Sequence, residues 1–200
     1  MTRNKRSSCG YSPRKVGTKE PKQRFLIVCE GQKTEPNYFK SFRVPRDVVE
    51  IDVKGLRKNP SKLVDKAKEF SNQGDYDQVW CVFDRDDWTS NDFNGAIKKA
   101  EGQGFKVAYA NEAFELWYVL HFEFLNTGIR RSNYCQKLIK FLGKYEKNSE
   151  DMYDRLLENQ NTAIKNAKKL FNQYNPHNPS KDNPCTTVHL LVQELNKFVS

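Results

Sequence analysis

The chain of 200 residues has little cysteine, no apolar run long enough to span a membrane, and no glycine-rich nucleotide-binding signature. Its five cysteines are scattered, odd in number and never in a CxxC pair, which argues against a disulfide framework and against a zinc site. The N-terminus has no apolar secretory core, so we expect a cytoplasmic protein that does not bind membranes. Because neither G-x-G-x-x-G nor G-x-x-x-x-G-K-[ST] occurs, an enzyme with a nucleotide cofactor is disfavoured.

Positive charge, by contrast, is abundant. The formal net charge of +9 favours a polyanionic partner, above all nucleic acid. Residues 1–24 carry eight Lys and Arg against one acid, Glu20, and have no apolar period. We therefore predict a flexible basic arm over 1–24, with Arg14 and Lys15 among the side chains that contact nucleic-acid phosphates. A solvated tail without a binding role is the alternative.

The apolar pattern predicts an α/β fold. Residues 25–29 and 79–83 are unbroken apolar runs, which are typical of strands buried on both faces of a parallel sheet. Strands alternating with helical stretches imply βαβ units, so we expect a mainly parallel sheet flanked by helices over 25–128. The C-terminal residues 129–200 read as a helical extension packed on this core. The other expected strands are 48–53 and 106–110, and the expected helices are 34–42, 60–72, 92–101, 112–124, 133–143, 151–158, 161–174 and 187–198.

Acidic side chains follow both buried strands at the point where each strand ends. Glu30 comes directly after the first strand, and Asp84 and Asp86 follow the later one. Ligands bind beyond the carboxyl ends of parallel strands, and neighbouring strands lie about 4.8 Å apart. If the two strands are neighbours, the three carboxylates crowd together, and a hard cation between them relieves their repulsion. The sequence therefore predicts a site for Mg²⁺ or Mn²⁺ held by Glu30, Asp84 and Asp86.

The same motifs carry a family resemblance. The segment 28–35 (VCEGQKTE) followed by 82–86 (VFDRD) resembles the Toprim domain of topoisomerases, primases and overcoming-lysogenization-defect nucleases. With 111–117 (NEAFELW) running to His121, the chain is similar to the RloB-like proteins, from about Phe25 to the C-terminus. The resemblance implies that the α/β core over 25–128 is Toprim-like, that Glu30, Asp84 and Asp86 bind Mg²⁺, and that the protein serves in defence against phage.

Other charged residues near these motifs are secondary candidates. Glu115 lies in an apolar stretch, where an unpaired carboxylate would be costly, so we expect it to position a metal or water or to form a salt bridge. Lys33 and Arg85 flank the acids and are candidates to bind phosphate oxygens. Glu35 is expected mainly to complement a helix dipole, and His121 to be a partly buried structural histidine.

These features favour a metal-dependent nuclease with Glu30, Asp84, Asp86 and Glu115 as its catalytic candidates. A phosphatase of the haloacid dehalogenase type also uses DxD, but there the motif closes the first strand, and here it closes the third. The remaining alternative is a nucleic-acid-binding or sensor subunit without turnover. A homodimer and a partner protein encoded nearby are further expectations, the first from base rates.

Overall fold

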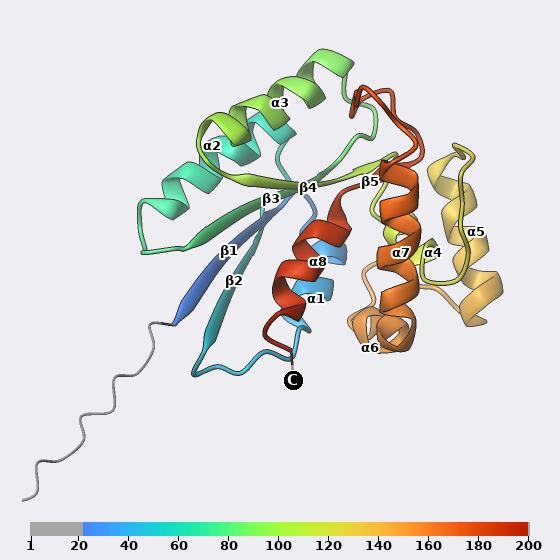
Figure 1. Ribbon diagram of the computed structural model, residues 1–200, viewed down its shortest axis with the longest axis horizontal. Helices are drawn as coiled ribbons and strands as arrows, with labels where there is room; N and C mark the ends of the chain where they lie inside the picture. Colours follow the sequence, from blue (N-terminus) through green and yellow to red (C-terminus); the bar gives the residue numbers. More distant parts are fainter. Residues whose placement is uncertain (1–21, 200) are drawn as a thin grey trace, which may run out of the picture.

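The computed structural model describes residues 22–199 and shows a five-stranded sheet with helices on both faces (Figure 1). The strand order is β2-β1-β3-β4-β5, in which the first four strands are parallel and β5 is antiparallel to β4. The predicted α/β class is therefore confirmed. The strands are β1 (Gln23–Cys29), β2 (Val49–Gly55), β3 (Gln78–Asp84), β4 (Lys106–Asn111) and β5 (Cys185–Thr186).

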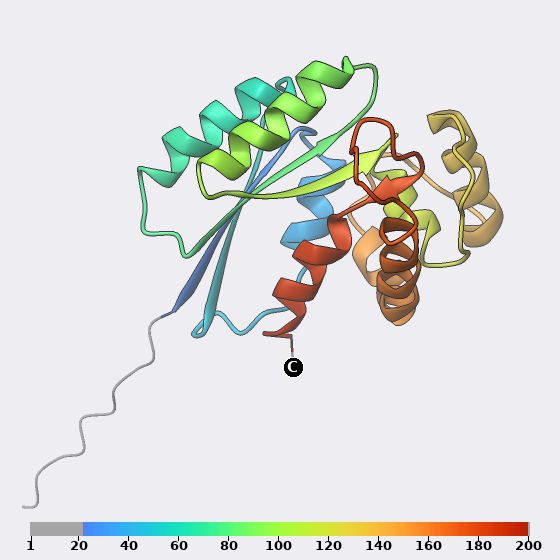
Figure 2. The same cartoon turned by 45° about the horizontal axis from the view of Figure 1, so that its top comes forward.

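Two layers of helices cover the sheet. The pair α2 (Pro60–Ser71) and α3 (Ser90–Gly102) lies on one face, and α1 (Thr34–Lys40) and α8 (Val188–Asn196) lie on the other, as Figure 2 shows from a second angle. Side chains of β1 alternate between two hydrophobic clusters: Leu26 and Val28 pack under α2 and α3, while Phe25 and Ile27 pack on the opposite face. Burial on both faces explains the unbroken apolar run of this strand.

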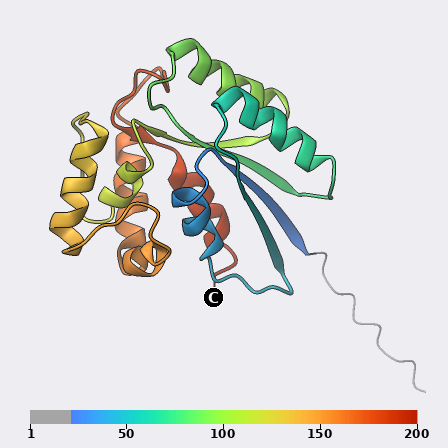
Figure 3. The ribbon, with the colours of Figure 1, turned by 180° about the vertical axis from the view of Figure 1, so that it is seen from behind.

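The C-terminal helices gather beside the end of β4. They comprise α5 (Arg131–Leu142), α6 (Met152–Leu156), the short 3₁₀ helix η1 (Leu157–Asn159) and α7 (Gln160–Phe171). Figure 3 shows this group from behind, next to α4 (Glu115–Val119). Its buried residues Tyr134, Leu156 and Leu170 belong to the same hydrophobic cluster as Phe25 and Trp80 of the sheet. The helical part and the sheet thus share a core.

Two expectations about the chain path need correction. The long helix expected over 112–124 is wrong, because α4 spans only five residues. The backbone on either side finds tertiary partners instead of continuing the helix: Phe114 N donates to Asp84 Oδ2 and Leu120 O accepts from Asn166. The two-residue strand β5 has too few residues to give an apolar pattern, and it was not expected.

Boundaries elsewhere differ by a few residues. The predicted basic arm ended at residue 24, but β1 already begins at Gln23, and residues 1–21 lie outside the described part of the chain. Arg14 and Lys15 therefore remain predictions. Within residues 22–199, no helix combines the length and the apolar character that crossing a bilayer requires.

Candidate active site

The carboxyl ends of β1 and β3 lie side by side, as the acidic motifs required. The two strands pair in parallel with Cys29 opposite Val82, and the next residue, Glu30, donates its backbone N–H to Val82 O at 2.8 Å. Asp84 is the last residue of β3. The chain direction and the register therefore bring Glu30 and Asp84 to the same edge of the sheet.

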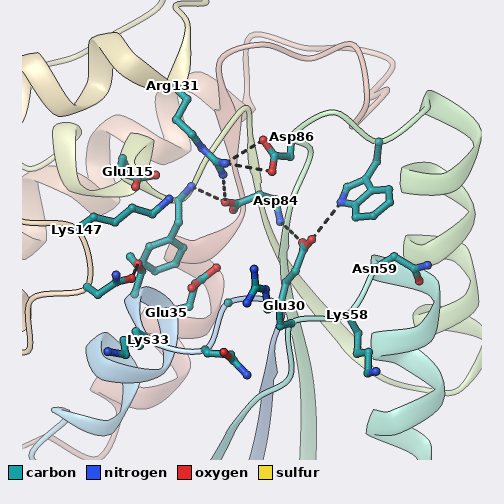
Figure 4. A pocket seen from close by; sticks show the side chains of 17 residues that line it. Glu30, Lys33, Glu35, Lys58, Asn59, Asp84, Asp86, Glu115, Arg131 and Lys147 are labelled. Atoms are coloured by element: carbon teal, nitrogen blue, oxygen red, sulfur yellow. Dashed lines mark hydrogen bonds and ion pairs between the residues drawn. The ribbon is translucent and has the colours of Figure 1, made fainter.

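These residues open into a cleft of about 520 Å³ that is lined by five acidic and five basic side chains. The acids lie on its floor and the bases come from several surrounding segments (Figure 4). Opposite charges in one cleft suit a ligand that combines a cation with phosphate groups. The acidic residues are Glu30, Glu35, Asp84, Asp86 and Glu115, and the basic residues are Lys33, Arg57, Lys58, Arg131 and Lys147.

Asp84 is the most buried of the predicted triad, with 7% of its surface exposed. Its Oδ2 accepts hydrogen bonds from Phe114 N and Arg131 Nη2, each at 3.1 Å. Among the described residues no group hydrogen-bonds to its buried Oδ1. Burial raises the pKa of Asp84 well above its usual value, Glu35 and Glu115 raise it further, and Arg131 opposes the shift.

Asp86 shares its cationic partner with Asp84. Arg131 Nη1 lies 3.0 Å from Asp86 Oδ1, so one guanidinium bridges both acids of the DxD motif. Asp86 has a φ of 39°, in the left-handed region, because the chain turns here as β3 ends. Both DxD carboxylates therefore face one point, as predicted, although the extended geometry assumed for the motif stops before Asp86.

Glu30 is held from two directions. Its Oε2 accepts a hydrogen bond from Asp84 N at 3.2 Å, and its Oε1 accepts one from Trp88 Nε1 at 3.1 Å. Burial raises the pKa of Glu30 to about 7, and these two hydrogen bonds oppose the rise. A carboxyl group with a pKa near neutrality can exchange a proton at physiological pH.

Glu35 and Glu115 are the other two acidic residues that line the cleft. Glu35 lies in the first turn of α1, and its carboxylate packs against Gly31 so closely that a Cβ on Gly31 would clash with Glu35 Oε2. Burial raises the pKa of Glu35, and Glu115 raises it further. Glu115 is 2% exposed, and Tyr145 OH approaches its Oε1 at 3.4 Å. Glu35 is thus part of the cleft and not only a dipole partner.

The helical part supplies one wall of the cleft. Arg131 comes from the first turn of α5, and Lys147 and Asn148 come from the segment between α5 and α6. Asn148 ties this segment to α1, because its Oδ1 accepts from Thr34 Oγ1 at 3.0 Å and its carbonyl accepts from Asn37 Nδ2. The cleft is therefore built jointly by the sheet and the C-terminal helices.

The two phosphate-binding candidates next to the acids behave differently. Lys33 lines the cleft, as predicted. Arg85 does not line it; its guanidinium lies 6.0 Å from the centre of the Phe93 ring, and its Nη1 donates to Asp86 O at 3.3 Å. Because alternate residues of a strand end point to opposite sides, Arg85 turns away from the side on which Asp84 lies.

His121 is structural. Its side chain is fully buried, its Nδ1 lies 2.9 Å from Trp117 O, and it does not line the cleft. Burial lowers its pKa to about 4. The histidine was expected to be partly buried, and the structure corrects this to full burial outside the cleft.

Four basic residues of the cleft and one tryptophan were missed in the sequence: Arg57, Lys58, Arg131, Lys147 and Trp88. Arg131 and Lys147 lie 45 or more residues beyond the DxD motif, in segments whose charges resemble ordinary solvated ones. Trp88 follows the motif closely, and an aromatic donor two residues after DxD was the one local signal available.

The carboxylate groups at the strand ends are the kind of ligand that binds a hard divalent cation. Carboxylate oxygens are the ligands that Mg²⁺ and Mn²⁺ prefer, and the unpartnered, buried Oδ1 of Asp84 is a lone acceptor among them. Over residues 22–199, however, no three His, Cys, Asp or Glu side chains stand together in a geometry ready to hold a metal ion. The guanidinium of Arg131 lies between the two aspartates.

Fold and cleft define the class of this protein: an α/β protein with a carboxylate-rich cleft at the carboxyl ends of two adjacent parallel strands. Residues 25–195 match the family model described as RloB-like protein, and the chain belongs to that family. The resemblance drawn from the motifs is confirmed at this level. No curated protein and no solved structure matches the chain.

Proposed function

We propose that this protein is a metal-dependent nuclease of the Toprim type that hydrolyses nucleic-acid phosphodiesters with Mg²⁺ or Mn²⁺. The observation that carries the proposal is the convergence of Glu30, Asp84 and Asp86 in a cleft that five basic side chains also line. A protein that only binds phosphate gains nothing from carboxylates facing its ligand, because they repel it.

Each group has a defined task in this reaction. Glu30, Asp84 and Asp86 would hold the cation, which supplies activation of a water molecule and neutralises charge on the leaving oxygen. Lys33, Lys58 and other basic residues of the cleft orient the phosphate.

Glu30 is also a candidate acid/base at the reacting oxygen, and burial raises its pKa to about 7 when no cation is bound. Glu115 lines the same cleft although it is almost fully buried, and it raises the pKa of its neighbours Asp84 and Glu35.

The partners follow from charge and family. Nucleic acid is the proposed substrate because the chain carries a net charge of +9 and a basic segment precedes β1. We extend the proposal to defence against phage, in the cytoplasm, on the basis of the RloB-like resemblance. A homodimer and a partner encoded nearby are part of the same proposal.

A cleavage assay tests the proposal. Purified protein is incubated with labelled tRNA, single-stranded DNA and duplex DNA in Mg²⁺, Mn²⁺ or EDTA, alongside Glu30→Gln and Asp84→Asn. The matched control is Asp87→Asn, an exposed acid next to the motif that does not line the cleft. We expect cleavage that requires metal, survives in Asp87→Asn and disappears in the other two variants. Cleavage that persists in EDTA or in Asp84→Asn would refute it.

One observation favours a second function. Arg131 already balances the charge of Asp84 and Asp86 without a metal, as expected for a non-catalytic nucleic-acid-binding or sensor subunit. In that case no substrate is cut, and Asp84→Asn binds nucleic acid as tightly as the wild type or more tightly, because a repulsive charge is lost. The same variants therefore separate the two functions.

A further inference from the structure

The Arg131 guanidinium lies between the two carboxylates that would hold a cation at the DxD motif. Its Nη2 lies 3.1 Å from Asp84 Oδ2 and its Nη1 lies 3.0 Å from Asp86 Oδ1, so each arm of the fork meets one carboxylate (Figure 4). One guanidinium thus bridges two carboxylates through charge-assisted hydrogen bonds, one to each acid. The pair is also partly shielded from water, since the side chains of Arg131 and Asp84 are 34% and 10% exposed.

The same oxygens cannot serve both cations at once. A divalent ion takes carboxylate oxygens at about 2.1 Å, and a guanidinium at hydrogen-bond distance from these oxygens would be strongly repelled by the ion. Asp84 Oδ2 already accepts from both Phe114 N and Arg131 Nη2, so a metal ion on this oxygen must replace the guanidinium, and a metal ion on the free Oδ1 of the same carboxylate would still lie close enough to repel it. Either Arg131 or the metal can lie between the two aspartates.

We propose that Arg131 is a built-in counter-ion of the DxD motif that a divalent cation displaces, and that the displaced guanidinium then binds the phosphate of the nucleic acid. The inference rests on the proposed function and adds to it a positioning residue from the helical part. Arg131 keeps Asp84 and Asp86 aimed at one point before the metal arrives. Metal entry then supplies the cleft with one more free cation.

The surroundings of Arg131 direct where its side chain goes on release. Charged groups that face it are Asp84, Asp86 and Glu115, and Lys147 lies across the same cleft. Arg131 is the first residue of α5, so its long side chain can swing about the helix start without moving the helix. The cleft that it borders is also the one that must hold the phosphate, whose oxygens match the guanidinium fork.

The first test measures metal affinity, without any turnover. Mn²⁺ binding is followed by calorimetry for the wild type, Arg131→Met and Arg130→Met. Arg130 is the matched control, because it removes the same charge one residue away, is exposed and makes no capping hydrogen bond through its side chain. We expect Arg131→Met to bind Mn²⁺ about tenfold more tightly than the control, equivalent to ~1.4 kcal/mol.

A charge-preserving variant guards against misfolding. If Arg131→Met is not folded in EDTA, Arg131→Lys takes its place, since an ammonium keeps the charge but cannot bridge both carboxylates in a planar fork. It should also bind Mn²⁺ more tightly than the wild type. Equal or weaker Mn²⁺ affinity in the folded Arg131 variant, relative to Arg130→Met, would overturn the displacement.

The second test measures the phosphate contact. Binding of a fluorescent oligonucleotide is measured in EDTA and in Ca²⁺, which replaces Mg²⁺ so that binding is measured without relying on cleavage. We expect Arg131→Met to match Arg130→Met in EDTA, where Arg131 is held by the aspartates, and to bind several-fold more weakly than that control in Ca²⁺. A loss of the same size in both conditions would show that Arg131 contacts nucleic acid without any metal trigger, and would refute the coupling.

Failure of this inference and failure of the proposed function look different. If the wild type and all Arg131 variants bind no Mn²⁺ at all, the metal-dependent nuclease fails and the displacement fails with it. If the wild type binds Mn²⁺, Asp84→Asn does not, and Arg131→Met shows no gain, the metal site stands and only the role of Arg131 is refuted.

Discussion

Gly55 braces the loop that carries Glu30, and adding a single methyl group there should damage the site. Gly55 is the last residue of β2, and the chain beyond it is hydrogen-bonded to the loop: Leu56 N donates to Cys29 O and Arg57 N to Glu30 O, at 3.1 and 2.7 Å. A Cβ on Gly55 would lie 2.6 Å from Gly31 O and 2.8 Å from the Gln32 Cα. Both neighbours are backbone atoms, which cannot rotate away.

The magnitude follows from these contacts. Ordinary van der Waals contact for a Cβ begins at 3.4 Å, so the loop would have to retreat by about 0.8 Å from Gly31 O alone. Overpacking of this kind costs roughly 1–3 kcal/mol of folding free energy. A displacement approaching 1 Å also exceeds the roughly 0.5 Å tolerance of a preorganised site. We therefore expect Gly55→Ala to unfold at lower urea concentration and to bind Mn²⁺ at least several-fold more weakly.

Gly95→Ala is the matched control. It is the same substitution at a glycine inside α3, where an added Cβ meets no atom of the described residues within 4 Å. Alanine is a better helix former, so this variant should be more stable by up to about 1 kcal/mol and bind Mn²⁺ as the wild type does. Urea unfolding and calorimetry measure both quantities. Wild-type stability and Mn²⁺ affinity in Gly55→Ala would refute the bracing role.

Three further predictions concern pH, fluorescence and phosphate binding. Burial lowers the pKa values of His121 and His189 to about 4, so below pH 6.5 the unfolded state binds more protons than the folded state. The free energy of unfolding is therefore kept above pH 6.5 and falls towards pH 4. Between pH 7 and pH 5, urea unfolding should show that the wild type loses about 2 kcal/mol more than His121→Gln. Trp88 donates to Glu30, whereas Trp80 and Trp117 are buried in the core, so Mn²⁺ should change tryptophan fluorescence in the wild type and not in Trp88→Phe. Lys147→Met should weaken oligonucleotide binding in Ca²⁺, measured by fluorescence anisotropy. The slope of log affinity against log salt concentration should become shallower by about one unit. An unchanged slope would show that Lys147 does not contact a phosphate.

Much of the fold could be predicted from local pattern. The apolar runs of β1 and β3 identified two strands that are buried on both faces, and the intervening helical periods implied a parallel sheet. The segment after β4 misled the same reasoning, because most of its residues are apolar. Such a composition fits any fully buried backbone, and tertiary hydrogen bonds to Asp84 and Asn166 decided against a long helix.

The candidate site, too, was predicted in part from the sequence and decided in part by the tertiary structure. The sequence by itself determined that acidic residues follow two buried strands, and the tertiary structure decided that these strands are neighbours, so that the acids meet at one edge of the sheet. The sequence also determined that Glu115 needs a hydrogen-bonding or cationic partner, since burying an unpaired carboxylate costs free energy.

Only the tertiary structure decided which cations face these acids. Arg131 and Lys147 reach the cleft because the C-terminal helices share the core of the sheet, whereas Arg85, adjacent in sequence, turns away towards Phe93. Charge partners across 45 residues are set by how helices pack, and a single sequence carries no local signal for that distance.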